Sequence, residues 1–156
     1  MTSTLPRRPT DQLKDALGRN YIRETVFTSE NALQFRKNAA SYIQDAKNEA
    51  LTPISRYTLA YEAVHALAVG FLYLYELAPS NNEGHRAQAL TILYTHLELD
   101  RDDRSEITHA HKQRNDKLYK SPAPPVGRTA AQSLVELAVR VEQVAREKLP
   151  DWYRLQ

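Results

Sequence analysis

The stretch SRYTLAYEAVHALAVGFLYLY, residues 55–75, decides the fold. Its apolar and aromatic side chains recur every three or four residues, which is the spacing that gathers them on one face of an α-helix. This face holds Tyr57, Ala60, Tyr61, Val64, Leu67, Ala68, Phe71, Leu74 and Tyr75. Ser55 is a suitable N-cap, and the polar turn that starts at Pro79 ends the pattern. We therefore predict a long helix that packs through this face.

The same periodicity recurs on both sides of this stretch. Further helices are predicted near residues 11–17, 29–50, 83–99, 105–119 and 129–148. The chain has only 4 glycines, and its 8 prolines lie mostly between these segments, which favours long helices over strands and hairpins. Short linkers between the middle helices favour antiparallel neighbours. The predicted fold is all-α, an up-and-down antiparallel bundle of four or five helices.

A length of 156 residues is enough for one domain. We divide it into an N-terminal extension with a short helix, residues 1–28, and the helical bundle, residues 29–150. The basic residues of the extension, Arg7 and Arg8, are expected to belong to a frayed tail.

Composition excludes several kinds of site. The absence of cysteine removes disulfides, thiolate metal sites and cysteine nucleophiles, and it suits a reducing compartment. A formal net charge of +2 is too small to indicate nucleic acid by itself. The N-terminus has no apolar core for a signal peptide, and charged or polar side chains interrupt the most apolar stretch, residues 60–77. We expect a cytoplasmic protein that does not enter a membrane.

The predicted helix at residues 105–119 carries an unusual mixture on one face. His111 and Arg114 share that face with Ile107 and Leu118. Because a buried charge needs an acceptor, Arg114 invites a functional explanation. A guanidinium beside an imidazole can hold a phosphate and help to move a proton. Alternatively, Arg114 lies at the edge of the face, where it reaches water or pairs with a carboxylate.

Two Glu-x-x-His pairs raise the question of a metal site. Such pairs, Glu62 with His65 and Glu106 with His109, occur in the dimetal centres of four-helix bundles. However, Glu106 lies in a first helical turn, where the helix dipole already favours an acidic residue. The remaining helices offer glutamates only near their ends. We predict no metal and no cofactor.

The order of these features resembles that of HEPN domains (higher eukaryotes and prokaryotes nucleotide-binding). The resemblance is carried by the alanine- and aromatic-rich helix at residues 55–68, the Gly-His turn at residues 84–85, and the Arg-Asn pair at residues 114–115 with Tyr119 after it. It covers roughly residues 29–148.

The resemblance implies a helical bundle that usually forms a homodimer, with the arginine-bearing helices lining a shared cleft. Many members are metal-independent RNases, often toxins of toxin–antitoxin or phage-defence systems that are paired with a nucleotidyltransferase-type antitoxin. Their motif is arginine, a polar residue, and a histidine four to six residues further on. Arg114 and Asn115 match, but Tyr119, Lys120 and Ser121 occupy the three positions allowed for the histidine.

We therefore expect a HEPN-like domain of a toxin–antitoxin or defence system that binds RNA, a nucleotide or a partner protein without catalysis. One alternative is a metal-independent endoribonuclease in which Arg114 and His111 are catalytic. A structural or assembly bundle is the other. The candidate binding residues are Asn115, Tyr119 and Lys112.

Overall fold

The computed structural model describes residues 5–81, 85–119 and 125–156, with the side chains of residues 115–119 outside the description. Its elements, in chain order, are α1 (Asp11–Gly18), β1 (Ile22–Glu24), α2 (Ser29–Ala46), α3 (Pro53–Tyr73), β2 (Leu77–Pro79), α4 (His85–His96), α5 (Arg101–Tyr119), α6 (Arg128–Lys148) and α7 (Pro150–Tyr153). The prediction of a mostly helical protein is confirmed.

The starts of the two long N-terminal helices differ slightly from the prediction. Thr28 caps α2 by accepting a hydrogen bond from the backbone N–H of Asn31 at 3.2 Å. Thr52 caps α3 in the same way, so the N-cap predicted at Ser55 is wrong. Pro53 begins α3, because a proline in the first turn loses no helical hydrogen bond.

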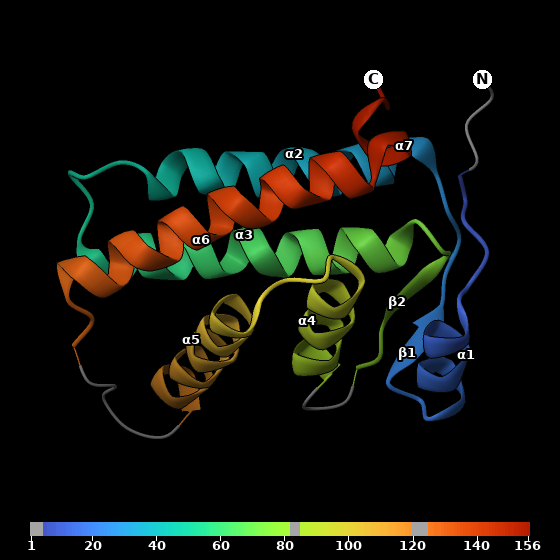
Figure 1. The fold of residues 1–156 in the computed structure, drawn as a ribbon, viewed down its shortest axis with the longest axis horizontal. Coiled ribbons are helices and arrows are strands. Elements are labelled where there is room, and N and C mark those ends of the chain that lie inside the picture. Colours follow the sequence, from blue (N-terminus) through green and yellow to red (C-terminus); the bar gives the residue numbers. More distant parts are fainter. Residues whose placement is uncertain (1–4, 82–84, 120–124) are drawn as a thin grey trace.

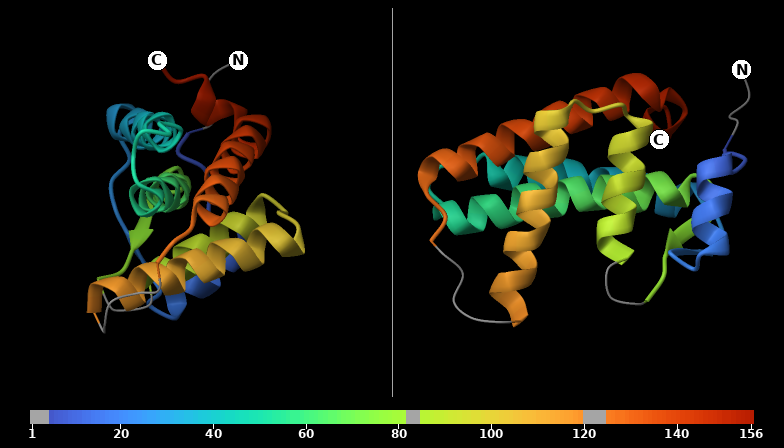
Figure 2. Two further views of the ribbon diagram at one scale, coloured as in Figure 1. Left: turned by 90° about the vertical axis from the view of Figure 1, so that its left-hand side faces the viewer. Right: turned by 60° about the horizontal axis from the view of Figure 1, so that its bottom comes forward.

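The helices form two groups. Helices α2, α3 and α6 lie alongside one another, with α3 in contact with both neighbours (Figure 1). Helices α4 and α5 cross this layer at a steep angle, as the right-hand view in Figure 2 shows. They therefore do not share the common axis expected of an up-and-down bundle.

A small antiparallel sheet was not predicted. Strand β1 pairs with β2 in the register Ile22 with Pro79, Arg23 with Ala78, and Glu24 with Leu77. Each strand has 3 residues, which is too short for an alternating pattern to stand out in the sequence. The pairing places the segment after α1 beside the end of α3, below the helical layer (Figure 1).

Segments outside the predicted long helices also enter the core. Leu13 and Ile22 from the N-terminal segment are buried, and so is Trp152 from α7. The indole N–H of Trp152 donates to the carbonyl of Ala32 at 2.8 Å, which ties α7 to α2. The N-terminal segment and α7 therefore belong to the same packed unit as the long helices.

The N-terminal arginine Arg7 is anchored, so our expectation of a frayed tail is wrong for this residue. Its guanidinium forms a two-bond contact with the Asp151 carboxylate, at 2.8 and 2.9 Å. Its backbone N–H donates to the carbonyl of Leu74. A bidentate arginine–carboxylate pair of this kind fixes orientation as well as charge. Arg7 thus links the start of the chain to α7.

Across the part of the chain that the structure describes, no helix is both long and apolar enough to cross a membrane.

Gly70 provides a test of how α7 packs on α3. A Cβ atom at this position would lie 2.6 Å from Trp152 Cζ2 and 2.9 Å from the Phe35 Cβ. Alanine normally stabilises a helix interior relative to glycine, but overpacking against a fully buried indole outweighs that gain. We expect Gly70→Ala to lower the free energy of unfolding by about 1–3 kcal/mol, measured by urea denaturation.

Gly18→Ala is the matched control, because beyond the chain neighbours and the backbone of its own helix no atom lies within 4 Å of the added methyl group. Its stability should equal or slightly exceed that of the wild type. An unchanged or increased stability of Gly70→Ala would contradict the packing of Trp152 described here.

Candidate functional site

A polar cluster lies where α3 meets α4 and α5. We call it the Glu62 cluster, and its members are Tyr61, Glu62 and His65 from α3, Arg86 from α4, and His111 and Arg114 from α5. Helical spacing explains why these residues point together. His111 and Arg114 are three apart on α5, and Tyr61 and His65 are four apart on α3, so each pair shares a face of its helix.

The carboxylate of Glu62 holds two arginines through one oxygen. Glu62 Oε1 accepts a hydrogen bond from an NH1 group of Arg86 and another from Nε of Arg114, both at 3.1 Å. The three side chains are only partly exposed, at 24% for Glu62, 29% for Arg86 and 24% for Arg114. Of the two explanations for Arg114 that the sequence left open, pairing with a carboxylate is therefore the one seen in the structure.

The ring of Tyr61 lies against both guanidiniums. Their Cζ atoms are 5.7 Å (Arg86) and 5.8 Å (Arg114) from the ring centroid. At such distances the ring quadrupole attracts a cation. Each guanidinium is therefore stabilised by two interactions, an ion pair with the Glu62 carboxylate and a cation–π contact with the Tyr61 ring.

The two histidines flank the same tyrosine. The Tyr61 hydroxyl and His111 Nδ1 share a hydrogen bond of 2.9 Å, whose direction depends on the His111 tautomer. The His65 ring stacks on the Tyr61 ring, with centroids 6.3 Å apart and planes 11° from parallel. Tyr61 thus connects the imidazoles of α3 and α5.

Burial and the two arginines keep both histidines neutral. Burial is the largest cause that lowers the pKa of His65, to about 3, and the charges of Arg86 and Arg114 lower it further. The same causes, in the same order, lower the pKa of His111. Burial raises the pKa of Tyr61, although both arginines oppose this shift. Near neutral pH, His111 can therefore accept a proton but carries no extra proton to donate.

The cluster has a surplus of positive charge. Among its six side chains, two guanidiniums and one carboxylate leave a net charge of +1 when both histidines are neutral. Guanidiniums present several N–H groups in a plane, a geometry that suits phosphate and carboxylate oxygens. The arrangement can therefore accept an anion.

The structure brings together some of the residues predicted from the sequence. His111 and Arg114 belong to the Glu62 cluster. Lys112 is exposed on α5. The side chains of Asn115 and Tyr119 lie outside the described residues.

Other parts of the HEPN-like motif also fall outside the description. They are Gly84 of the Gly-His turn and positions 120 and 121, two of the three allowed for the motif's histidine.

The sequence did not predict that Glu62, His65 and Arg86 lie in one cluster with Arg114. The sequence pattern offers Glu62 and His65 only as possible metal ligands, and it gives no signal for Arg86. Arg86 and Arg114 lie 24 and 52 residues from Glu62 along the chain, so no short motif links the three. An acidic residue at the edge of the apolar face of α3 was the one available signal, since it needs a partner from another helix.

The second Glu-x-x-His pair plays a different part. The Glu106 carboxylate accepts a hydrogen bond from the Ser133 hydroxyl at 2.8 Å, and His109 is exposed beside Gln113. Within residues 5–81, 85–119 and 125–156, no group of three or more His, Cys, Asp or Glu side chains is arranged to hold a metal ion.

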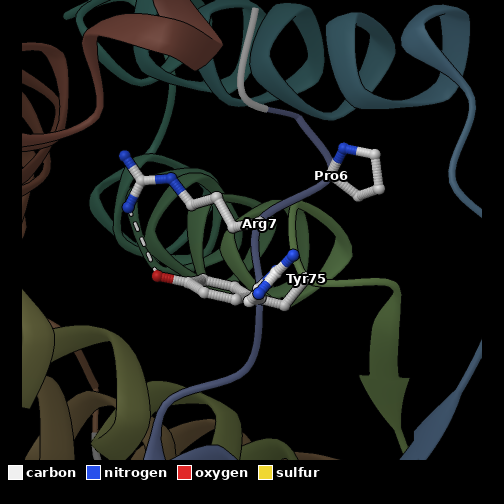
Figure 3. Close-up of a pocket in the computed structure, with 4 residues that line it drawn as sticks. Pro6, Arg7 and Tyr75 are labelled. Carbon is white, nitrogen blue, oxygen red and sulfur yellow. Dashed lines mark hydrogen bonds between the residues drawn. The ribbon is translucent and has the colours of Figure 1, made fainter.

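A shallow groove near the N-terminus is a second place to consider. It encloses about 470 Å³ and is lined by Pro6, Arg7, Arg8 and Tyr75. Figure 3 shows the Arg7 guanidinium reaching the Tyr75 hydroxyl, at 3.3 Å. Asp151 already pairs with Arg7, and Arg8 is exposed, so this groove does not bring two partly buried guanidiniums together as the Glu62 cluster does.

Comparison with protein-family models, curated proteins and solved structures finds no match to this chain. The resemblance to HEPN domains therefore rests on the residues quoted above.

The lowered pKa of His65 predicts an acid-sensitive stability. The unfolded chain takes up a proton at His65 near pH 6.5, whereas the folded protein does so only near pH 3. Protons therefore favour the unfolded state, and stability falls as the pH drops below 6.5. When the pH falls from about 7.5 to about 5, the free energy of unfolding should decrease by about 2 kcal/mol less in His65→Gln than in the wild type.

Urea denaturation at the two pH values measures this difference. His109→Gln, which removes an exposed histidine from α5, should follow the wild type. His111 and His96, whose pKa values are also lowered, remain in all three proteins. Equal losses in His65→Gln and the wild type would show that His65 is not held neutral by its surroundings.

Proposed function

We propose that this chain is a HEPN-like helical domain that binds RNA through a backbone phosphate at the Glu62 cluster, without cleaving the RNA. The observation that supports the proposal is the pair of partly exposed guanidiniums, Arg86 and Arg114, with one carboxylate between them. The homodimer and a toxin–antitoxin or defence role, with a nucleotidyltransferase-type partner, are part of the same proposal and derive from the resemblance.

The net positive charge of the Glu62 cluster is the first reason to expect a phosphate ligand. A phosphodiester carries one negative charge, which matches the surplus of the cluster, and guanidiniums bind its oxygens in a planar, directional way. Partial burial strengthens this attraction relative to an arginine in open solvent. A free nucleotide offers the same chemical group, and competition by a mononucleotide distinguishes the two ligands.

Catalysis is not part of the leading proposal, because the cluster offers no acid for the leaving oxygen. RNA cleavage by the ribose 2′-hydroxyl requires a base for its proton and an acid for the leaving oxygen. Both histidines of the cluster are neutral, and arginine stays protonated near neutral pH. The raised pKa of Tyr61 makes its hydroxyl a weak acid. Among the described side chains of the cluster, no group is therefore poised to protonate the leaving oxygen.

A metal-independent endoribonuclease is the second candidate, and one observation favours it. His111 is neutral, lies one turn from Arg114 and is held by Tyr61 at 2.9 Å. A neutral imidazole beside a guanidinium could take the 2′-hydroxyl proton while Arg114 stabilises charge on the phosphate. In this case His111 replaces the histidine missing from the family motif.

Loss of either cluster arginine should weaken RNA binding. We expect Arg114→Ala and Arg86→Ala each to reduce the affinity for a fluorescent single-stranded RNA by about tenfold, roughly 1.4 kcal/mol. Each variant should also lower the slope of log affinity against log salt concentration by about one, because one phosphate contact is lost. Fluorescence anisotropy over a range of salt concentrations measures both quantities.

Arg140→Ala is the control, since it removes a more exposed arginine of α6 that is paired with Asp103. It should leave the affinity within about twofold of the wild type. If Arg114→Ala lowers stability while the RNA affinity stays unchanged, the cluster is a structural ion pair and the third alternative, an assembly bundle, replaces the proposal.

Incubation with RNA in EDTA separates binding from catalysis. We expect the wild type to leave both mixed tRNA and single-stranded RNA intact, because the acid for the leaving oxygen is missing. Gel electrophoresis after long incubation at high protein concentration is the measurement. Cleavage that disappears in both His111→Ala and Arg114→Ala would establish the endoribonuclease instead.

A further inference from the structure

The position of Glu62 has a consequence for any anion that reaches the cluster. Its Oε1 atom accepts from Nε of Arg114 and from NH1 of Arg86, each at 3.1 Å. These are the donors that a phosphate oxygen would use. An internal carboxylate therefore stands where the external anion would bind.

The charge of Glu62 also acts on an anion that uses the remaining N–H groups of the arginines. Each guanidinium has five such groups, so a phosphate could approach without replacing every hydrogen bond to Glu62. Two negative charges would then lie within a few ångströms of each other in a partly desolvated site, where their repulsion is stronger than in water. Glu62 opposes the bound anion whether or not it is displaced.

The arginines do not depend on Glu62 alone for their positions. The Tyr61 ring lies under both guanidiniums, 5.7 Å from Arg86 Cζ and 5.8 Å from Arg114 Cζ. Glu62 is itself 24% exposed, so its carboxylate can turn toward water when an anion replaces it on the two arginines. The donors should therefore stay gathered when the carboxylate leaves.

We propose that Glu62 is a built-in competitor that lowers the affinity of the Arg86–Arg114 pair for phosphate. This inference rests on the proposed function, because it assigns the same two arginines to a phosphate ligand. It adds a residue that sets the affinity by occupying the site rather than by contacting the ligand. Any change that moves the Glu62 carboxylate away from Arg86 and Arg114 would then strengthen phosphate binding without any new contact to RNA.

If Glu62 instead positions the two arginines for the ligand, the expected effect of its removal is the opposite. A carboxylate whose effect is to hold two guanidiniums in place for a ligand would strengthen binding, and its removal would weaken it. Glu62→Gln separates the two roles, because it keeps the shape and one acceptor oxygen and removes the charge.

The experiment uses inorganic phosphate as the probe and isothermal titration calorimetry as the readout, at constant ionic strength. We expect Glu62→Gln to bind phosphate about tenfold more tightly than the wild type, which corresponds to about 1.4 kcal/mol. Glu98→Gln is the matched control, since it removes an exposed glutamate paired with Lys148 and should bind phosphate as the wild type does. The double variant Glu62→Gln with Arg114→Ala should lose the gain.

Unchanged or weaker phosphate binding by Glu62→Gln would overturn the inference, as would an equal gain in Glu98→Gln. Undetectable binding by both the wild type and Glu62→Gln would overturn it as well. If Glu62→Gln fails to fold by circular dichroism, Glu62→Ala, which removes the same charge, is expected to bind more tightly and is read by the same criteria.

RNA anisotropy with the same proteins distinguishes this failure from failure of the proposed function. The function fails if the wild type and Arg114→Ala bind RNA equally, whatever the phosphate titration shows. The inference alone fails if Arg114→Ala weakens RNA binding while Glu62→Gln changes the affinity for neither RNA nor phosphate. Tighter binding of both ligands by Glu62→Gln, lost in the double variant, supports the two proposals together.

Discussion

Helix α3 must be covered on nearly all sides, and the rest of the molecule is arranged around that requirement. Its buried residues are not confined to one stripe, because Ala63, Leu72 and Tyr73 are buried in addition to the predicted face. Helices α2 and α6 flank it, while α4 and α5 cross it (Figure 1). Burial of apolar surface is the dominant favourable term in folding, so a helix that is apolar on several faces needs a neighbour on each of them.

The polar groups of α3 then determine which parts of its neighbours lie close. Arg56 is only 5% exposed, and its guanidinium donates to the carbonyl of Ala46 at 2.9 Å and to the Gln132 side chain at 2.6 Å. Ala46 is the last residue of α2, where the helix dipole presents partial negative charge to a cation. Arg56 therefore joins the end of α2 to α6 through α3.

Glu62 makes the corresponding link on the other side of α3. It joins α4 and α5 to the central helix through Arg86 and Arg114. The same need for partners, met here by two arginines for one carboxylate, produces the surplus of positive charge on which the proposed function depends. Structure and candidate function thus share one set of interactions, so the effects of a substitution on folding and on ligand binding have to be measured separately.

Local periodicity explains how much the sequence determined by itself. A spacing of 3.6 residues along residues 55–75 is a property of consecutive side chains, and it was enough to predict α3, the other long helices and the shared face of His111 and Arg114. Tertiary structure alone decided the β1–β2 pairing, the steep crossing of α4 and α5, and the meeting of Glu62 with Arg86 and Arg114. The reason is that these contacts join residues far apart in the chain, and their formation depends on how the helices pack rather than on any local pattern.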